Sequence, residues 1–314
     1  MDAKIILFLI IVILSLDYLL NSVLSYLNYK SLSKPVPREL DNIYDESDYL
    51  KSQDYNKSIY WFNLITSSIT FITLLLVFNY ELLGKLDNVL RSFSFENEIS
   101  LSLLFFGSIF FINELISIPF QLYRNFIIEE KFGFNKMSFK TFFLDKIKSY
   151  FLVIIVGGLL ISILLISIIY FSNNFWIYFW VIMSLFTVFI NLFYTSLILP
   201  IFNKLKPLED GSLKDKIYNY AKSVSFPLSN IFVIDGSKRS SKANAFFSGL
   251  GKSKKIVLYD TLIKNHSEEE LVSVLAHEVG HYKNNHILSN LILSILFTGF
   301  MLFVLSKFLF NSEI

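Results

Sequence analysis

The sequence predicts a mainly α-helical membrane protein, a polytopic helical bundle of six spans with one small inserted α+β unit. The first observation is composition, because 54% of the 314 residues are hydrophobic and only 17% are charged. Soluble proteins average about 45–50% apolar and about 25% charged residues. The second observation is six separate apolar stretches, and the third is a water-compatible segment that begins near Pro200. Together they indicate membrane helices interrupted by one polar insertion.

Six stretches are long enough to cross a bilayer, since a core of about 30 Å needs about 20 helical residues. We expect spans at residues 5–27, 60–80, 100–122, 150–171, 175–199 and 287–310. The first contains Asp17 and has no small-residue cleavage site before Asn28, so we interpret it as a retained helix and not a removed signal peptide. Asn113 and Glu114 lie at mid-depth in the third span, where such residues usually face the bundle interior or a wet cavity. A hydrogen bond that serves only helix packing is an equal alternative for them.

The distribution of Lys and Arg predicts the orientation of the chain, because cytoplasmic loops are enriched in both. These residues concentrate in the loops after the first and third spans, while the opposite side holds only Lys4, Lys85 and Arg91. We therefore expect the N-terminus outside and the polar segment 201–286 in the cytoplasm. The lipid bilayer is one partner, whereas a net charge of +2 gives no reason to propose nucleic acid as another.

The polar segment divides the chain into a membrane domain, residues 1–205, and a second domain, residues 206–314. One predicted helix has apolar residues three or four positions apart, at Leu213, Ile217, Ala221 and Val224. Short strands are expected at 231–234, 243–247 and 255–259, the last two joined by a turn at 249–253. This pattern predicts a small α+β unit inserted between two membrane helices.

A further helix is predicted for residues 268–283, and its start is well marked. Ser267 precedes it and Glu270 follows three residues later, which is the capping-box arrangement that satisfies free backbone amides. The segment contains no proline and one glycine, and its apolar residues sit mostly three or four apart. The pentapeptide His277-Glu278-Val279-Gly280-His281 therefore falls on a helix.

This pentapeptide matches the metal-binding motif of zinc peptidases. His277 and His281 are four residues apart, so both imidazoles project from one helix face and can share a tetrahedral Zn²⁺. Glu278 stands beside the first ligand, where it can take a proton from the attacking water and pass it to the leaving amine. We predict metal ligands at His277 and His281, the catalytic base at Glu278, and Zn²⁺ as the cofactor. The alternative is a helix that merely carries two histidines on a polar face.

A catalytic zinc site needs a third protein ligand, and the sequence offers no obvious one. In metzincins it would be a histidine at position 287 after a glycine at 284, but those positions hold Ile287 and Asn284. His286 is one residue out of register, so we interpret it as a polar residue at the membrane border. With no cysteine in the chain, a downstream glutamate remains, and only Glu313 follows, beyond a predicted membrane helix. We expect one Zn²⁺ per chain, with the glutamate ligand missing from this chain.

A strand beside the metal helix can bind an extended substrate by backbone pairing. Asn244 lies in the segment Asn244-Ala245-Phe246-Phe247, where its side chain would anchor a main-chain group of the substrate. We therefore predict Asn244 as a substrate-binding residue. The alternative is a turn residue with no role in binding.

Long runs of the sequence resemble the integral-membrane CAAX prenyl protease family, type I, a family of zinc metallopeptidases. The similar runs are SDYLKSQDYNKS (47–58), IEEKFGFNK (128–136), PIFNKLKPL (200–208), DGSKRSS (235–241), NAFF (244–247) and the metal helix. They cover essentially the whole chain in order, so the resemblance is far more specific than the pentapeptide alone.

The resemblance implies a ring of membrane helices around a water-filled chamber that the zinc site faces. It implies removal of the C-terminal tripeptide from proteins whose CAAX cysteine is prenylated, so the partner would be the C-terminal peptide of such a protein. His277 and His281 would be zinc ligands, Glu278 the catalytic base and Asn244 a substrate-binding residue. Family members continue with a seventh membrane helix and the glutamate ligand, so we expect a chain truncated at its C-terminus.

Other functions stay open at this point. A membrane protease that clears damaged membrane proteins would use the same site on different substrates. A truncated chain without its third ligand would be an inactive membrane protein that binds partners, or a half-enzyme completed by another chain. A transporter would explain the spans but not the capped metal helix.

Overall fold

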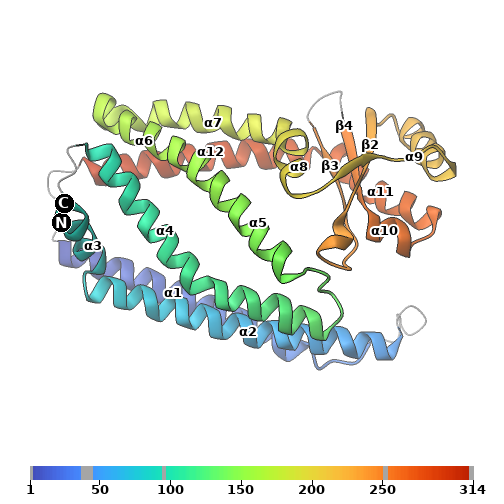
Figure 1. Cartoon of the computed structure of the whole chain (residues 1–314), viewed down its shortest axis with the longest axis horizontal. Helices are drawn as coiled ribbons and strands as arrows, with labels where there is room; N and C mark the ends of the chain where they lie inside the picture. The colour runs from blue at the N-terminus through green and yellow to red at the C-terminus, as the bar shows by residue number, and fades with distance from the viewer. Residues whose placement is uncertain (1–2, 37–44, 94–96, 250–253, 311–314) are drawn as a thin grey trace. The chain divides into compact units, whose positions relative to one another are not determined.

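The computed structural model describes residues 3–36, 45–93, 97–249 and 254–310 (Figure 1). It divides into two compact units, Met1–Asn135 and Lys136–Asn311. Each unit contains helices of membrane length, and the second also contains a four-stranded sheet. The predicted fold class, a mainly α membrane bundle with a small α+β unit, is confirmed.

The number of membrane helices differs slightly from the prediction. Five helical runs in the described part of the chain are long and apolar enough to cross a membrane, where six were predicted. One run, Phe139–Phe202, contains both the fourth and the fifth predicted spans, and it reverses at the short 3-10 turn η4 (Ser172–Asn174). The helices on either side of this turn pack against each other (Figure 1). The difference therefore comes from a helical hairpin with almost no loop.

The first unit consists of helices α1 (Ala3–Ser31), α2 (Glu46–Asn79), α3 (Leu82–Arg91) and α4 (Glu98–Tyr123), and α4 continues as the π-helical turn η2 (Arg124–Glu129). α1 packs along α2, where the rings of Tyr18 and Phe71 stack 4.5 Å apart. α2 starts well before the predicted span because the Asp45 side chain accepts hydrogen bonds from the amides of Ser47 and Asp48. The short helix α3 was not predicted.

The membrane helices of the second unit are α5 (Phe139–Leu152), α6 (Gly158–Phe171), α7 (Phe175–Phe193), α8 (Leu199–Phe202) and α12 (His286–Leu309), with π-helical turns η3 (Val153–Gly157) and η5 (Tyr194–Ile198). Figure 1 shows α6, α7 and α12 side by side. The indole Nε1 of Trp180 donates to the Ile295 carbonyl oxygen at 2.8 Å. A Cβ added at Gly299 would lie 2.8 Å from that nitrogen, so the glycine allows α7 and α12 to approach closely.

The sheet has the strand order β1-β2-β4-β3. Its strands are β1 (Leu205–Pro207), β2 (Leu228–Ile234), β3 (Ala245–Ser248) and β4 (Lys254–Tyr259). β3 and β4 form the predicted antiparallel pair, and the predicted turn at 249–253 lies outside the described residues after Gly249. β1 and the parallel pairing of β2 with β4 were not predicted. β3 lies at one edge of the sheet, which leaves one side of its backbone unpaired within the sheet.

Helices cover both faces of this sheet. On one face, α9 (Ser212–Ser223), α10 (Asp260–Asn265) and α11 (Glu268–Lys283) enclose the main core, which includes Ile217, Ile256 and Leu275. On the other face, Val257 and Ile234 pack with Leu199 at the end of the membrane hairpin. The sheet therefore joins α11 to the membrane helices of its own unit.

Candidate metal centre

α11 begins with the capping box that the sequence predicted. The Ser267 side chain accepts from the Glu270 amide, and the Glu270 carboxylate accepts from the Ser267 amide at 2.8 Å. This backbone hydrogen bond, together with the Ser267 hydroxyl, lowers the pKa of Glu270. A carboxylate at the first turn also complements the positive end of the helix dipole. The helix spans Glu268–Lys283, the bounds expected from the sequence.

One face of α11 is buried and the other carries the predicted metal ligands. Leu271, Leu275 and Val279 are at most 3% exposed and belong to the main core of the unit. His277 and His281 are exposed on the opposite side, and Glu278 is half-buried between these faces. Because the core holds the apolar face, the face of α11 that carries His277 and His281 is turned away from the core.

The imidazole rings of His277 and His281 face each other through their Nε2 atoms. Nε2 of His277 lies 3.2 Å from Nε2 of His281. Two ligands of a tetrahedral Zn²⁺ with Zn–N bonds of about 2.0–2.1 Å would be about 3.3 Å apart. The donor set and its spacing therefore fit a zinc ion, although the roles of His277, Glu278 and His281 stay predictions.

A third imidazole lies against this pair. His286, the first residue of α12, has its Nδ1 2.8 Å from Nδ1 of His281. The sequence led us to interpret His286 as a polar residue at the membrane border, and its contact with His281 was missed. The signal for it was the Asn284-Asn285 pair, because asparagine favours the tight turn that places the first residue of α12 beside the last turn of α11.

The predicted absence of a third ligand stays a prediction. Among the residues that the structure describes, no three His, Cys, Asp or Glu side chains converge as a metal-binding group. Glu313, the only acidic residue after the metal helix, lies outside the described residues. Within the described chain, the zinc-compatible set consists of two imidazoles.

Asn244 lies immediately before the edge strand β3, next to α11. Its carbonyl oxygen accepts from the Tyr259 amide at 3.0 Å, and its side-chain oxygen accepts from the Ala245 amide at 2.9 Å. The side chain is exposed, and β3 contacts α11. A substrate-binding role for Asn244 stays a prediction.

A cavity of about 300 Å³ lies beside β3. It is lined by Ile190, Asn191, Tyr194, Phe246, Phe247, Ser248, Gly249 and Ile287. These residues come from the end of the membrane hairpin, from β3 and from the residue after His286. Its walls are mainly aromatic and aliphatic, so an apolar side chain would fit there.

Two charged residues, Lys254 and Arg239, connect segments that lie near the site. Neither was singled out from the sequence. Lys254 is 3% exposed, and its ammonium donates to the Gly249 carbonyl oxygen at 2.6 Å and lies 5.1 Å from the centre of the Tyr282 ring. Burial lowers the pKa of Lys254. Arg239 donates to the Asp145 carboxylate at 2.7 and 3.0 Å and to the Phe202 carbonyl oxygen at 2.7 Å. This pair ties the loop before β3 to α5 and α8.

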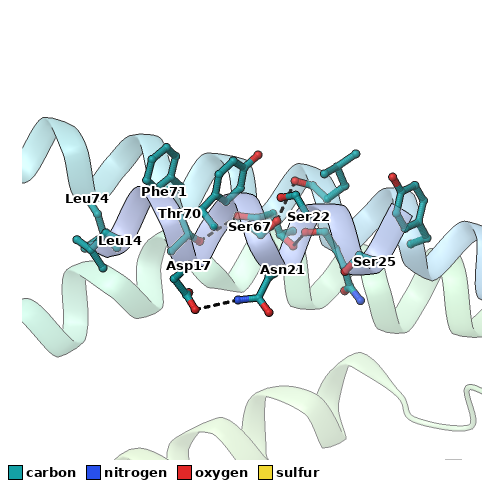
Figure 2. Close-up of a pocket in the computed structure, with 14 residues that line it drawn as sticks. Leu14, Asp17, Asn21, Ser22, Ser25, Ser67, Thr70, Phe71 and Leu74 are labelled. Atoms are coloured by element: carbon teal, nitrogen blue, oxygen red, sulfur yellow. Dashed lines mark hydrogen bonds between the residues drawn. The ribbon is translucent and has the colours of Figure 1, made fainter. Parts of the chain in front are cut away.

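A polar hollow in the first unit is of a different kind. A cavity of about 570 Å³ between α1 and α2 is lined by Leu14, Leu64, Phe71, Leu74 and a row of polar side chains, and we call this row the polar seam (Figure 2). Its polar members are Asp17, Tyr18, Asn21, Ser22, Ser25, Tyr60, Asn63, Thr66, Ser67 and Thr70. Asn21 donates to the Asp17 carboxylate at 3.0 Å, and Tyr18 shares a hydrogen bond with Ser68 at 2.8 Å. The described residues of this seam include no histidine.

Comparisons with known proteins identify the family. Residues 25–204 match the family model described as CAAX prenyl protease N-terminal, five membrane helices, and residues 207–313 match peptidase family M48. The chain is 38% identical to the probable CAAX prenyl protease 1 of Schizosaccharomyces pombe, over 91% of this chain and 63% of that protein. It is 36% identical to CAAX prenyl protease 1 of Saccharomyces cerevisiae, over 91% of this chain and 65% of that one.

The chain belongs to the CAAX prenyl protease family of M48 peptidases. The fold agrees, because the crystal structure of S. mikatae Ste24p matches with a TM-score of 0.87 at 36% identity, over 93% of this chain and 70% of that one. The resemblance stated from the sequence is thus confirmed. The chain spans 63% and 65% of the two yeast relatives, so it corresponds to about two thirds of such a protease.

Proposed function

We propose that this chain carries the catalytic helix of a membrane zinc metalloendopeptidase that removes the C-terminal tripeptide after a prenylated cysteine. The observation that carries the proposal is the 3.2 Å spacing of two Nε2 atoms on the capped helix α11, in a chain of the CAAX prenyl protease family. The substrate class comes from the family, and the chemistry comes from the helix.

Different residues of α11 would bind the metal and transfer the proton. His277 and His281 would hold the metal through Nε2, and the buried face of the helix fixes the side from which both residues project. When bound, zinc polarises the scissile carbonyl and makes water a good nucleophile near neutral pH. Glu278 would take the proton of the attacking water and deliver it to the leaving amine. No covalent acyl intermediate is needed.

The edge strand β3 would receive the substrate. Its unpaired backbone can add the extended C-terminal peptide as a further strand, and Asn244 at its start would anchor a main-chain group. The cavity beside β3 would accept an apolar side chain of that peptide, next to Ile287 and Phe247. The recognised partner is therefore a peptide with apolar residues near its carboxyl end.

The orientation and the domain division belong to the same proposal. Lys and Arg cluster in the segments 30–57 and 124–148, so these segments and the zinc site would face the cytoplasm, with the N-terminus outside. Residues 1–205 would form the membrane domain and residues 206–314 the peptidase domain. A cytoplasmic zinc site would meet prenylated proteins at the membrane surface.

The test is hydrolysis of a farnesylated CAAX peptide by membranes that contain the protein. We expect release of the C-terminal tripeptide, loss of this activity with a zinc chelator, and its return when Zn²⁺ is added back. The same peptide without the farnesyl group should be cleaved more slowly. Cleavage that withstands the chelator would contradict the proposal.

A misfolded membrane protein in the same assay distinguishes the alternative substrate class. Faster cleavage of that protein than of the farnesylated peptide would favour a quality-control protease over CAAX processing. Cleavage of neither substrate would favour a chain that is inactive as it stands.

A further inference from the structure

The turn between α11 and α12 brings His286 against the second predicted ligand. The amide of Asn284 bonds back to the Gly280 carbonyl oxygen at 3.1 Å, and Asn285 adopts the left-handed conformation with φ 55°. Asparagine enters this region more readily than most residues. His286 therefore starts α12 beside the last turn of α11, with its Nδ1 2.8 Å from Nδ1 of His281.

Zinc binding would fix the direction of this hydrogen bond. If Nε2 of His281 binds the metal, that nitrogen carries no proton, so the proton of the neutral ring is on Nδ1. Nδ1 of His281 is then the donor, and Nδ1 of His286 is the acceptor. A group that accepts from the second nitrogen of a ligand holds the ring in orientation and raises its basicity.

We propose that His286 is a positioning residue for the zinc ligand His281 and does not bind the metal itself. The inference rests on the proposed function, because it takes His281 as a ligand. The nitrogen of His281 that meets His286 is Nδ1, whereas Nε2 of the same ring faces His277. The three histidines also do not converge as a metal-binding group, in agreement with a supporting role for His286.

The test compares the Zn²⁺ affinity of purified variants of the whole chain by competition with a chromophoric chelator. His286→Leu removes the acceptor, and His286→Asn restores an oxygen acceptor near the place of Nδ1. His266→Leu is the matched control, because the ring of His266 lies 3.1 Å from the Leu262 carbonyl oxygen at the end of α10. Circular dichroism and thermal unfolding establish that each variant folds. Absorption of the Co²⁺-loaded protein reports the number of direct ligands.

We expect the His286→Leu variant to bind Zn²⁺ about 10–100-fold more weakly, as is typical when a partner of a metal ligand is lost. The His286→Asn and His266→Leu variants should bind nearly as the wild type does, and the Co²⁺ bands of the His286→Leu variant should keep their position. Unchanged affinity in the His286→Leu variant, or no rescue by asparagine, would overturn the inference. So would a band shift that indicates a lost imidazole. A wild-type chain that binds no zinc would refute the proposed site itself.

Discussion

Polar side chains gather on α11 and, in a different way, along the polar seam between α1 and α2. On α11 they converge, since two Nε2 atoms are 3.2 Å apart and a third imidazole touches one of these rings. Along the seam they are spread over several helical turns, and many bond within their own helix, as Thr70 does to the Thr66 carbonyl oxygen at 2.9 Å. The convergence on α11 fits a metal site, whereas we expect the distributed seam to meet water, as polar groups at membrane depth usually do.

The two regions also differ in how their helices are held. The inner face of α11 lies in a closed core with α9 and the sheet. In α2 no described residue is buried, and α1 is as open. We therefore expect the loss of a polar side chain on α11 to remove a specific contact, whereas neighbouring polar side chains can compensate for a loss along the seam.

The largest expected effect is on the rate of peptide hydrolysis, and it comes from a change at Glu278. Replacing it with glutamine keeps the size of the side chain and removes the proton acceptor, so hydrolysis of the farnesylated peptide should fall by about 10²–10⁴-fold. Zn²⁺ binding should persist, because both imidazoles remain. Rates and bound zinc are measured on the same preparation, and full activity of the Glu278→Gln variant would refute its role as the base.

The next effect is expected at the Arg239–Asp145 pair. Arg239→Met should lower the free energy of unfolding by about 3 kcal/mol, because it leaves the Asp145 carboxylate without its bidentate partner. Both side chains are about one-fifth exposed, which keeps the loss at the low end for a buried pair. Thermal unfolding in detergent, followed by tryptophan fluorescence, measures the loss.

Lys140→Met, an exposed change on α5, is the control for this pair and should have little effect. Adding Asp145→Asn to the Arg239→Met variant should recover part of the stability, because the uncompensated charge is then gone. If the losses of the Arg239→Met and Asp145→Asn single variants simply add in the double variant, the two residues do not interact.

A matched pair of glycines gives the third prediction. Gly299→Ala should destabilise the second unit by about 1–3 kcal/mol, because the new methyl group would overlap the Trp180 indole. Gly280→Ala meets nothing within 4 Å and should stabilise α11 by about 0.5–1 kcal/mol through helix propensity. Unfolding temperatures of the two variants should therefore move in opposite directions, and a shift in the same direction would contradict the packing of α7 on α12.

The smallest effects on stability are expected along the seam, where single changes should cost no more than about 0.5 kcal/mol. The chain has no native cysteine, so introduced cysteines report accessibility directly. Asn21→Cys and Ser22→Cys should react with a charged methanethiosulfonate, because polar groups at membrane depth face water and not lipid. Leu16→Cys on the same helix is the control and should stay unlabelled. Equal labelling at the three positions would mean that the seam is no more hydrated than the surface beside it.

Local patterns predicted much of this molecule because each was set by neighbours in the chain. The bounds of α11 follow from the Ser267 cap and from apolar spacing, and both depend on residues within a few turns. The β3–β4 pair follows from two short apolar runs around a glycine. The spans follow from length and apolarity alone, which is why a reversal within one continuous helical run, at Ser172–Asn174, altered only their number.

Features that depend on distant contacts were not predictable in the same way. The pairing of β2 with β4 joins strands about 25 residues apart, and β1 is only three residues long. The Arg239–Asp145 pair joins residues 94 positions apart in the sequence. The contact of His286 with His281 depends on a left-handed residue, Asn285, and register rules for zinc ligands do not consider such a turn.

X-ray absorption at the zinc edge of the Zn²⁺-loaded wild-type chain tests the central claim most directly. The convergence of His277 and His281 predicts two imidazole nitrogens at about 2.0–2.1 Å from the metal, with oxygen ligands completing the site. Both imidazole signals should disappear in the double variant His277→Ala and His281→Ala. A zinc spectrum without imidazole scattering, or one that the double variant leaves unchanged, would show that α11 is not the metal helix.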